Sequence, residues 1–168
     1  MSISMYEASI PVFTHVLGNL SAILEKAQAH ARARGIDPAV LVNGRLAPDM
    51  FPLSRQVQIA TDVVKGFAAR MTGAEPPSWP DTESTFEELI GRIGKAVDYL
   101  GSVEPSRLEG TEGRTISFKI RGEPVTFQGR AYLQKFVLPN LYFHTSITYA
   151  ILRHNGVDLG KRDFLGPI

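Results

Sequence analysis

Two side chains that could do chemistry, Asn140 and His144, lie four residues apart in the stretch GRAYLQKFVLPNLYFHTSITYAILRHNG. Residues four apart on a helix lie one turn apart on the same side. The unperturbed pKa of histidine is near neutral, so an imidazole there can act as an acid, a base or a metal ligand. A buried histidine that hydrogen-bonds to a neighbouring hydroxyl or amide is the structural alternative, and the sequence leaves both interpretations open.

The other groups that could bind a metal ion or a substrate are scattered along the chain. Glu7, Asp62 and Glu83 could supply carboxylates, but no spacing selects them. His154 lies about 15 Å beyond His144 at 1.5 Å per helical residue, so the two cannot share an ion. The sequence contains no glycine-rich phosphate loop, nucleophile elbow or His-Glu-x-x-His motif. Whether the protein is an enzyme therefore stays open.

The stretch 129–156, which carries Asn140 and His144, is predicted to be one long helix. Its apolar residues recur at spacings of three and four, as on one helix face, and Gly156 follows two basic residues as a stop signal. Pro139 lies inside the pattern and has no N–H for the carbonyl of Lys135, so a kink is expected there. Asn140 is expected to satisfy a backbone group at this kink.

Three further helices, each with an apolar stripe, are predicted over residues 4–34, 53–71 and 84–100. Pro11 is expected to bend the first helix early, and Thr82 or Ser84 is expected to cap the third. Asp37 and Pro38 predict a short helix through Val42.

The regions outside the long helices are also partly predictable. Trp79 is expected to anchor its proline-rich loop to the bundle. From Thr115 the hydrophobic period changes to two, which predicts a β-hairpin whose tight turn is Gly122-Glu123. The tail after Gly156 is expected to be irregular and to pack back through three apolar side chains, Leu159, Phe164 and Leu165.

The pattern predicts an all-α fold, a four-helix bundle with a short β-hairpin before the last helix, in a single domain over residues 1–168. A chain of 168 residues with 43% hydrophobic residues can bury a real core. The formal net charge of +1, without a basic patch, predicts no nucleic-acid partner. The uncharged run 136–152 is too short and too polar for a membrane span, and no signal peptide is apparent. The absence of cysteine is compatible with the cytoplasm.

The pieces RLAPDMFPLSRQVQIATD, DTESTFEEL and LPNLYFHTSITYAILRHNGVDLGKRDFLG resemble an uncharacterised bacterial family of domains of unknown function. That family belongs to the DinB-like, or YfiT-like, superfamily of metal-dependent four-helix bundles. The resemblance runs nearly end to end, and its most specific part is the YAILRHNGVDLGKRDFLG tail. It implies the bundle fold and a homodimer.

The metal site of the superfamily resembles one histidine from the second helix plus a His-x-x-x-His pair on the last helix. By position, His144 corresponds to the second histidine of the pair, Asn140 to the first, and Gln58 to the histidine of the second helix. One imidazole of three is therefore kept, so we expect a degenerate site and no cofactor. Gln58, which lies off the apolar stripe of its helix, is otherwise expected to be exposed.

Three functions follow as hypotheses. The first is a cytoplasmic protein that binds a small-molecule ligand through a pocket with His144, Asn140 and Gln58. The second is a metal-dependent enzyme of the thiol-transferase or hydrolase type, in which His144 helps to hold a divalent metal ion, Zn or Ni. The third is a purely structural dimeric protein.

Overall fold

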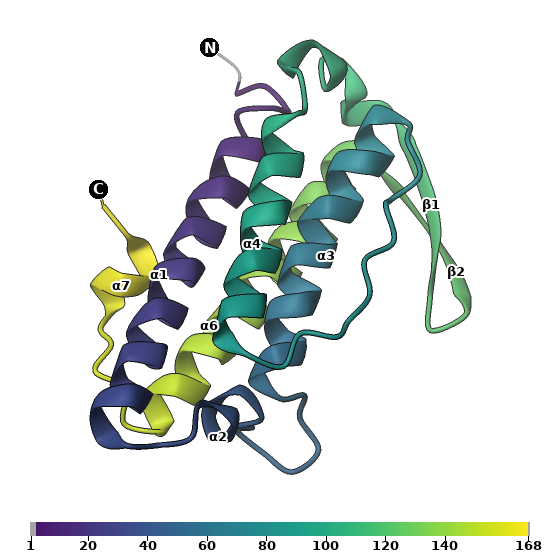
Figure 1. Cartoon of the computed structure of the whole chain (residues 1–168). Helices are drawn as coiled ribbons and strands as arrows, with labels where there is room; N and C mark the ends of the chain where they lie inside the picture. Colours follow the sequence, from purple (N-terminus) through teal and green to yellow (C-terminus); the bar gives the residue numbers. More distant parts are fainter. Residues whose placement is uncertain (1–2, 168) are drawn as a thin grey trace.

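Four long helices dominate the fold: α1 (Ile10–Arg34), α3 (Leu53–Thr72), α4 (Phe86–Gly101) and α6 (Leu138–His154). The computed structural model describes residues 3–167. In it α4 packs against both α1 and α3, and α3 packs against α6 (Figure 1). The prediction of an all-α four-helix bundle with a hairpin is confirmed.

The core is built from the apolar stripes of all four helices. Phe13, Phe67, Phe86 and Leu141 are fully buried, one on each helix. The rings of Phe13 and Phe67 meet edge to face with their centroids 5.3 Å apart. Each such side chain contributes about 1.5–3 kcal/mol by leaving water, so this core fixes how α3 and α6 face each other.

The first helix begins later than predicted, at Ile10, and residues 5–9 form turns. Pro11 lies at the second helical position, where its missing N–H needs no partner, so the expected early bend has no cause. The short helix α2 (Pro38–Val42) is confirmed, and the side chain of its cap Asp37 accepts a hydrogen bond from the N–H of Ala39 at 2.9 Å.

The cap of α4 is Thr85, one residue after the predicted Ser84. Its hydroxyl accepts from the N–H of Glu88, and the Glu88 carboxylate accepts from the N–H of Thr85, which makes a capping box. Gly73, with φ +81°, ends α3 in the left-handed conformation that glycine adopts without strain. Residues 74–85 between these two ends run as a loop along the bundle.

Two short helical turns, η1 (Pro105–Arg107) and η2 (Thr111–Gly113), connect α4 to the hairpin of β1 (Thr115–Ile120) and β2 (Glu123–Gln128). The predicted hairpin is confirmed, but its turn residues are Arg121 and Gly122, with φ +51° and +89°, and not Gly122-Glu123. Two positive φ values are typical of a type I′ turn, which matches strand twist. The rings of Phe118 and Phe127 pack on the start of the last helix.

The predicted long C-terminal helix is confirmed as three continuous pieces: α5 (Gly129–Tyr132), a π-helical turn η3 (Leu133–Val137) and α6. In the π-helical turn the N–H of Leu138 bonds the carbonyl of Leu133, five residues back. Pro139 follows at once and has no N–H to continue the regular ladder. The expected kink is therefore a wide turn just before the proline.

The tail forms a five-residue helix, α7 (Lys161–Leu165), which packs on α1. Leu159 is buried, and the ring of Phe164 meets Tyr149 edge to face at 6.2 Å, as expected for a tail that packs back. Leu165 is 41% exposed, so the prediction that it packs inward is wrong. Within residues 3–167, no helix has the length and apolar character needed to cross a membrane.

Candidate functional site

His144 lies on the face of α6 that packs against α3, and only 8% of the residue is exposed. Its Nδ1 atom is 2.7 Å from Oε1 of Gln56, and Nε2 of Gln56 donates to the carbonyl of Phe51 at 3.1 Å. Because the amide nitrogen of Gln56 is the donor in that second bond, its oxygen accepts, and Nδ1 of His144 carries the proton. The predicted buried imidazole with an amide partner is found.

Burial, the larger cause, and the positive charge of Arg55 together lower the pKa of His144 from 6.5 to about 4. The imidazole is therefore neutral near pH 7, with its lone pair on Nε2. This atom has no hydrogen-bond partner within residues 3–167, and no buried side-chain nitrogen or oxygen there lacks one. Nε2 of His144 therefore touches solvent and can accept a hydrogen bond.

Asn140 lies one turn before His144 but does not face it. Its Nδ2 donates to the carbonyl of Phe136 at 2.6 Å, beside Pro139. This bond satisfies a carbonyl at the point where the helix changes from π to α geometry. The interpretation of Asn140 as a group that satisfies a backbone carbonyl at the kink is confirmed.

Gln58 is 5% exposed, so the expectation of an exposed helix residue is wrong. Its Nε2 donates to Glu83 at 3.0 Å, and its Oε1 accepts from Arg55 at 3.3 Å. It therefore lies under the loop 74–85, and its amide is engaged there. The residue of α3 that meets His144 is Gln56. The resemblance predicted Gln58 for this position, which is two residues later.

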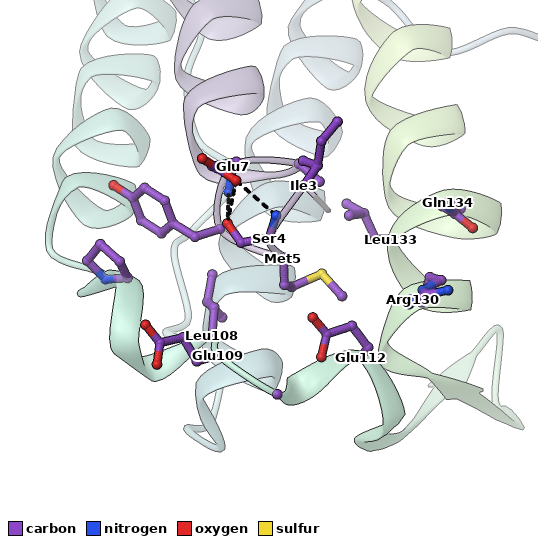
Figure 2. Close-up of a pocket in the computed structure, with 14 residues that line it drawn as sticks. Ile3, Ser4, Met5, Glu7, Leu108, Glu109, Glu112, Arg130, Leu133 and Gln134 are labelled. Carbon is purple, nitrogen blue, oxygen red and sulfur yellow. Dashed lines mark hydrogen bonds between the residues drawn. The ribbon is translucent and has the colours of Figure 1, made fainter. Parts of the chain in front are cut away.

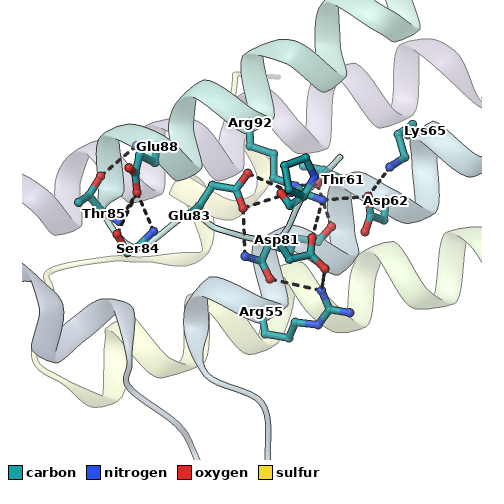
Figure 3. Close-up of polar contacts among 12 residues, drawn as sticks. Arg55, Thr61, Asp62, Lys65, Asp81, Glu83, Ser84, Thr85, Glu88 and Arg92 are labelled. Carbon is teal, nitrogen blue, oxygen red and sulfur yellow. Dashed lines mark hydrogen bonds and ion pairs between the residues drawn. The ribbon is translucent and has the colours of Figure 1, made fainter. Parts of the chain in front are cut away.

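Arg92 of α4 is the centre of a charged cluster that the sequence did not reveal (Figure 3). It is 4% exposed, it donates hydrogen bonds of 2.9–3.0 Å through all three of its nitrogens, and its Nη2 also forms an ion pair with Asp81 at 3.0 Å. The partners are the hydroxyl of Thr61, the carbonyl of Pro80 and the carboxylates of Asp62, Asp81 and Glu83. The cluster fastens the loop 74–85 to α3 and α4.

Trp79 in the same loop lies over this cluster. The ammonium of Lys65 is 4.4 Å from the centre of its ring and also bonds Asp62 at 2.6 Å. Tyr99 of α4 meets the indole edge to face at 6.3 Å. The expectation that Trp79 anchors its loop to the bundle is confirmed.

The residues around His144 do not fit a resident metal ion. A catalytic zinc site takes about three imidazole or carboxylate ligands that converge on one point. Within residues 3–167, no three histidine, cysteine, aspartate or glutamate side chains are grouped for this. The carboxylates of Asp62 and Glu83 are bound to Arg92, and Glu7 accepts from the N–H and hydroxyl of Ser4. The positive Arg55 further disfavours a cation at His144.

A cleft of about 830 Å³ is shown in Figure 2. The N-terminal turns that help to form it lie at the opposite end of the bundle from α2 (Figure 1). We call this cleft the N-terminal cleft. It is formed by the turns at residues 3–8, the segment 105–112 and the start of the last helix, at Arg130, Leu133 and Gln134. His144, Asn140 and Gln58 do not line it, and His144 lies ten residues after Gln134, about 15 Å along the helix.

Comparisons with known proteins agree with this fold. Residues 5–165 match the family described as "Domain of unknown function (DUF1993)". The crystal structure of a DinB family member protein from Shewanella denitrificans is similar, with a TM-score of 0.89 and 40% sequence identity over 98% of this chain and 93% of that one. A search of curated proteins finds no match. The chain therefore belongs to the DUF1993 family, which confirms the predicted resemblance to an uncharacterised DinB-like family.

Proposed function

We propose that this protein binds a small molecule in the N-terminal cleft and does so without a resident metal ion. The observation that carries the proposal is the cleft itself. Its volume of about 830 Å³ lies within the roughly 300–1,000 Å³ typical of small-ligand sites. Buried apolar side chains form its floor and charged side chains its walls, which is the composition that such sites have.

The proposal can be tested by screening small fragments against the ¹⁵N-labelled protein by NMR. We expect amide shifts at the cleft, around Leu108 and Leu133, for the fragments that bind. Gln134→Trp should abolish these shifts, because Gln134 is an exposed residue of the cleft wall and an indole there would fill the space. Lys135→Trp, at the exposed neighbour that does not line the cleft, is the matched control. Shifts that are confined to another region would refute the proposal.

The rival is a metal-dependent enzyme that uses His144. The carboxylates that could join His144 at a metal ion already bind Arg92 or Ser4, which supports the metal-free alternative. Metal analysis of untagged protein separates the two. We expect less than about 0.1 equivalent of zinc or nickel after purification without chelators. Stoichiometric metal that disappears in His144→Ala, but not in His154→Ala at the exposed end of α6, would establish the rival.

We also infer a homodimer through the outer face of α6. The run 136–152 has no charged residue, and on this helix Tyr142 and Phe143 are 41% and 55% exposed. Two neighbouring exposed aromatic side chains on an uncharged helix face are the kind of apolar patch that a partner covers. In a two-fold dimer the same patch meets itself, so a patch without charge avoids repulsion between like charges.

A reducing cytoplasmic location, in keeping with the absence of cysteine, is part of the proposal and can be checked by fractionation.

A further inference from the structure

The floor of the N-terminal cleft is apolar and fixed. Met5, Leu108 and Leu133, which come from three separate segments, are 4%, 0% and 3% exposed. Their positions are set by the packing of the core, so the floor exists before any ligand arrives. A ligand that uses it needs an apolar body.

The walls carry charges of both signs that do not neutralise one another. Glu112 of η2 points toward the space below Met5, and Arg130 lies on the neighbouring helix α5 (Figure 2). No ion pair joins Glu112 to Arg130, and neither side chain has a hydrogen-bond partner within residues 3–167. In the Arg92 cluster of the same protein, by contrast, all three guanidinium nitrogens donate hydrogen bonds.

The other carboxylates of the cleft differ in their availability. Glu7 accepts two hydrogen bonds from Ser4, at 2.9 Å each, and so serves the local turn. Glu109 is exposed and belongs to the same segment 105–112, but its carboxylate lies apart from that of Glu112 in Figure 2. The cleft thus offers an acidic wall on the segment 105–112 and one basic group on α5.

One wall of the cleft is also the π-helical turn η3. Leu133 and Gln134 belong to this turn and line the cleft. Turns of this kind are rare, and they occur often at functional sites, where the extra residue re-aims side chains. Pro139 removes one N–H from the helical ladder just after this turn. Within the turn, Leu133 is 3% exposed at the floor of the cleft, and Gln134 is exposed at its wall.

From these features we propose that the N-terminal cleft binds a small zwitterion of about the size of a dipeptide, with an ammonium group, a carboxylate and an apolar body. This rests on the proposed function and names its ligand class. The carboxylate of Glu112 binds the ammonium group, and the guanidinium of Arg130 binds the carboxylate. The apolar body lies on Met5, Leu108 and Leu133.

The test uses three peptides with one shared apolar body: leucyl-leucine, its N-acetyl derivative and its C-terminal amide. We expect leucyl-leucine to bind to the wild-type protein at least about tenfold more tightly than either blocked form, measured by calorimetry or NMR titration. Glu112→Gln should remove the preference for the free ammonium group. Arg130→Gln should remove the preference for the free carboxylate.

Two controls and two contrary outcomes make the test decisive. Glu75→Gln and Arg32→Gln, at exposed positions away from the cleft, should leave all three affinities unchanged, and unchanged melting temperatures should show that the variants fold. Equal binding of the three peptides, or no binding of any, overturns the zwitterion. The proposed function survives that result if fragments still shift the amides of the cleft, and it falls with the zwitterion if none do.

Discussion

At the scale of single residues, the pKa of His144 predicts how stability depends on pH. It is lowered to about 4 in the folded protein, against 6.5 for an unperturbed histidine. The unfolded chain therefore binds the proton first, so the contribution of His144 is complete above about pH 6.5 and is lost as the pH falls toward 4. We expect a loss on the order of 1 kcal/mol between pH 6.5 and 5, since each pH unit is worth at most about 1.4 kcal/mol.

This loss is measured as the difference between wild type and His144→Gln in urea unfolding at the two pH values. The difference removes the contribution of the carboxylates, which titrate in both proteins. A histidine NMR titration of the wild type should place the ring well below pH 6. Equal pH dependence of the two proteins would contradict the assignment of a neutral, desolvated imidazole.

Arg92 predicts a large loss of stability on substitution. Arg92→Leu would leave Asp62, Asp81 and Glu83 beside one another without their common cation. Removal of one partner from a buried ion pair costs about 3–5 kcal/mol, but these carboxylates are 15–37% exposed, so we expect about 2–3 kcal/mol in urea unfolding. Arg92→Lys should recover only part of this, because an ammonium has three donors and no planar fork. Arg32→Leu, on exposed α1 surface, should change stability by less than about 0.5 kcal/mol.

The sequence predicts the position and role of a residue well where these depend on its own helix alone. The inward position of His144 and the role of Asn140 follow from spacing and from Pro139. Gln58 was assigned to the exposed side because its cover, the loop 74–85, lies far away in the chain. Arg92 lies three residues after Leu89, on the apolar stripe of α4, and that is the available signal. Its partners are up to 31 residues away, and nothing local selects them among the acidic residues.

At the scale of elements, the hairpin turn gives a pair of opposite predictions. Arg121 adopts φ +51°, which is uncommon for a residue with a side chain, and Gly122 adopts φ +89°. Asparagine tolerates the first position of a type I′ turn better than arginine, so Arg121→Asn should stabilise by roughly 0.5 kcal/mol. Gly122→Ala should destabilise by about 1 kcal/mol or more, since alanine is strained at that φ. Melting temperatures that shift in the same direction in both variants would refute this turn.

The type of each helix or strand was predicted more reliably than the residues at which it begins and ends. The starts of α1 and α4 lie six and two residues after the predicted ones, because several neighbouring residues can begin a helix and tertiary contacts choose among them. The π-helical turn was expected only as a kink. Pro139 shows that one N–H is missing, but whether the helix bends or widens depends on the hairpin rings that pack beside Tyr132 and Phe136.

At the scale of the whole molecule, the two candidate regions are separated along the last helix. His144 lies where α6 meets α3, and the N-terminal cleft lies about 15 Å away near Gln134. The cleft was not predicted, because its walls come from three separate segments, at residues 3–8, 105–112 and 130–134, that come together only when the bundle forms. The resemblance to a family with a metal site also predicts a site at His144, and it predicts none at the N-terminal cleft.

The outer face of α6 gives the prediction for the assembly. We expect light scattering after size exclusion to report twice the 18.5 kDa mass of the chain for the wild type. Phe143→Glu places two like charges opposite each other across a two-fold axis and should produce the monomer, whereas Ala29→Glu on the exposed side of α1 should stay dimeric. A monomeric wild type rejects the homodimer, and a dimeric Phe143→Glu protein moves the interface to another face.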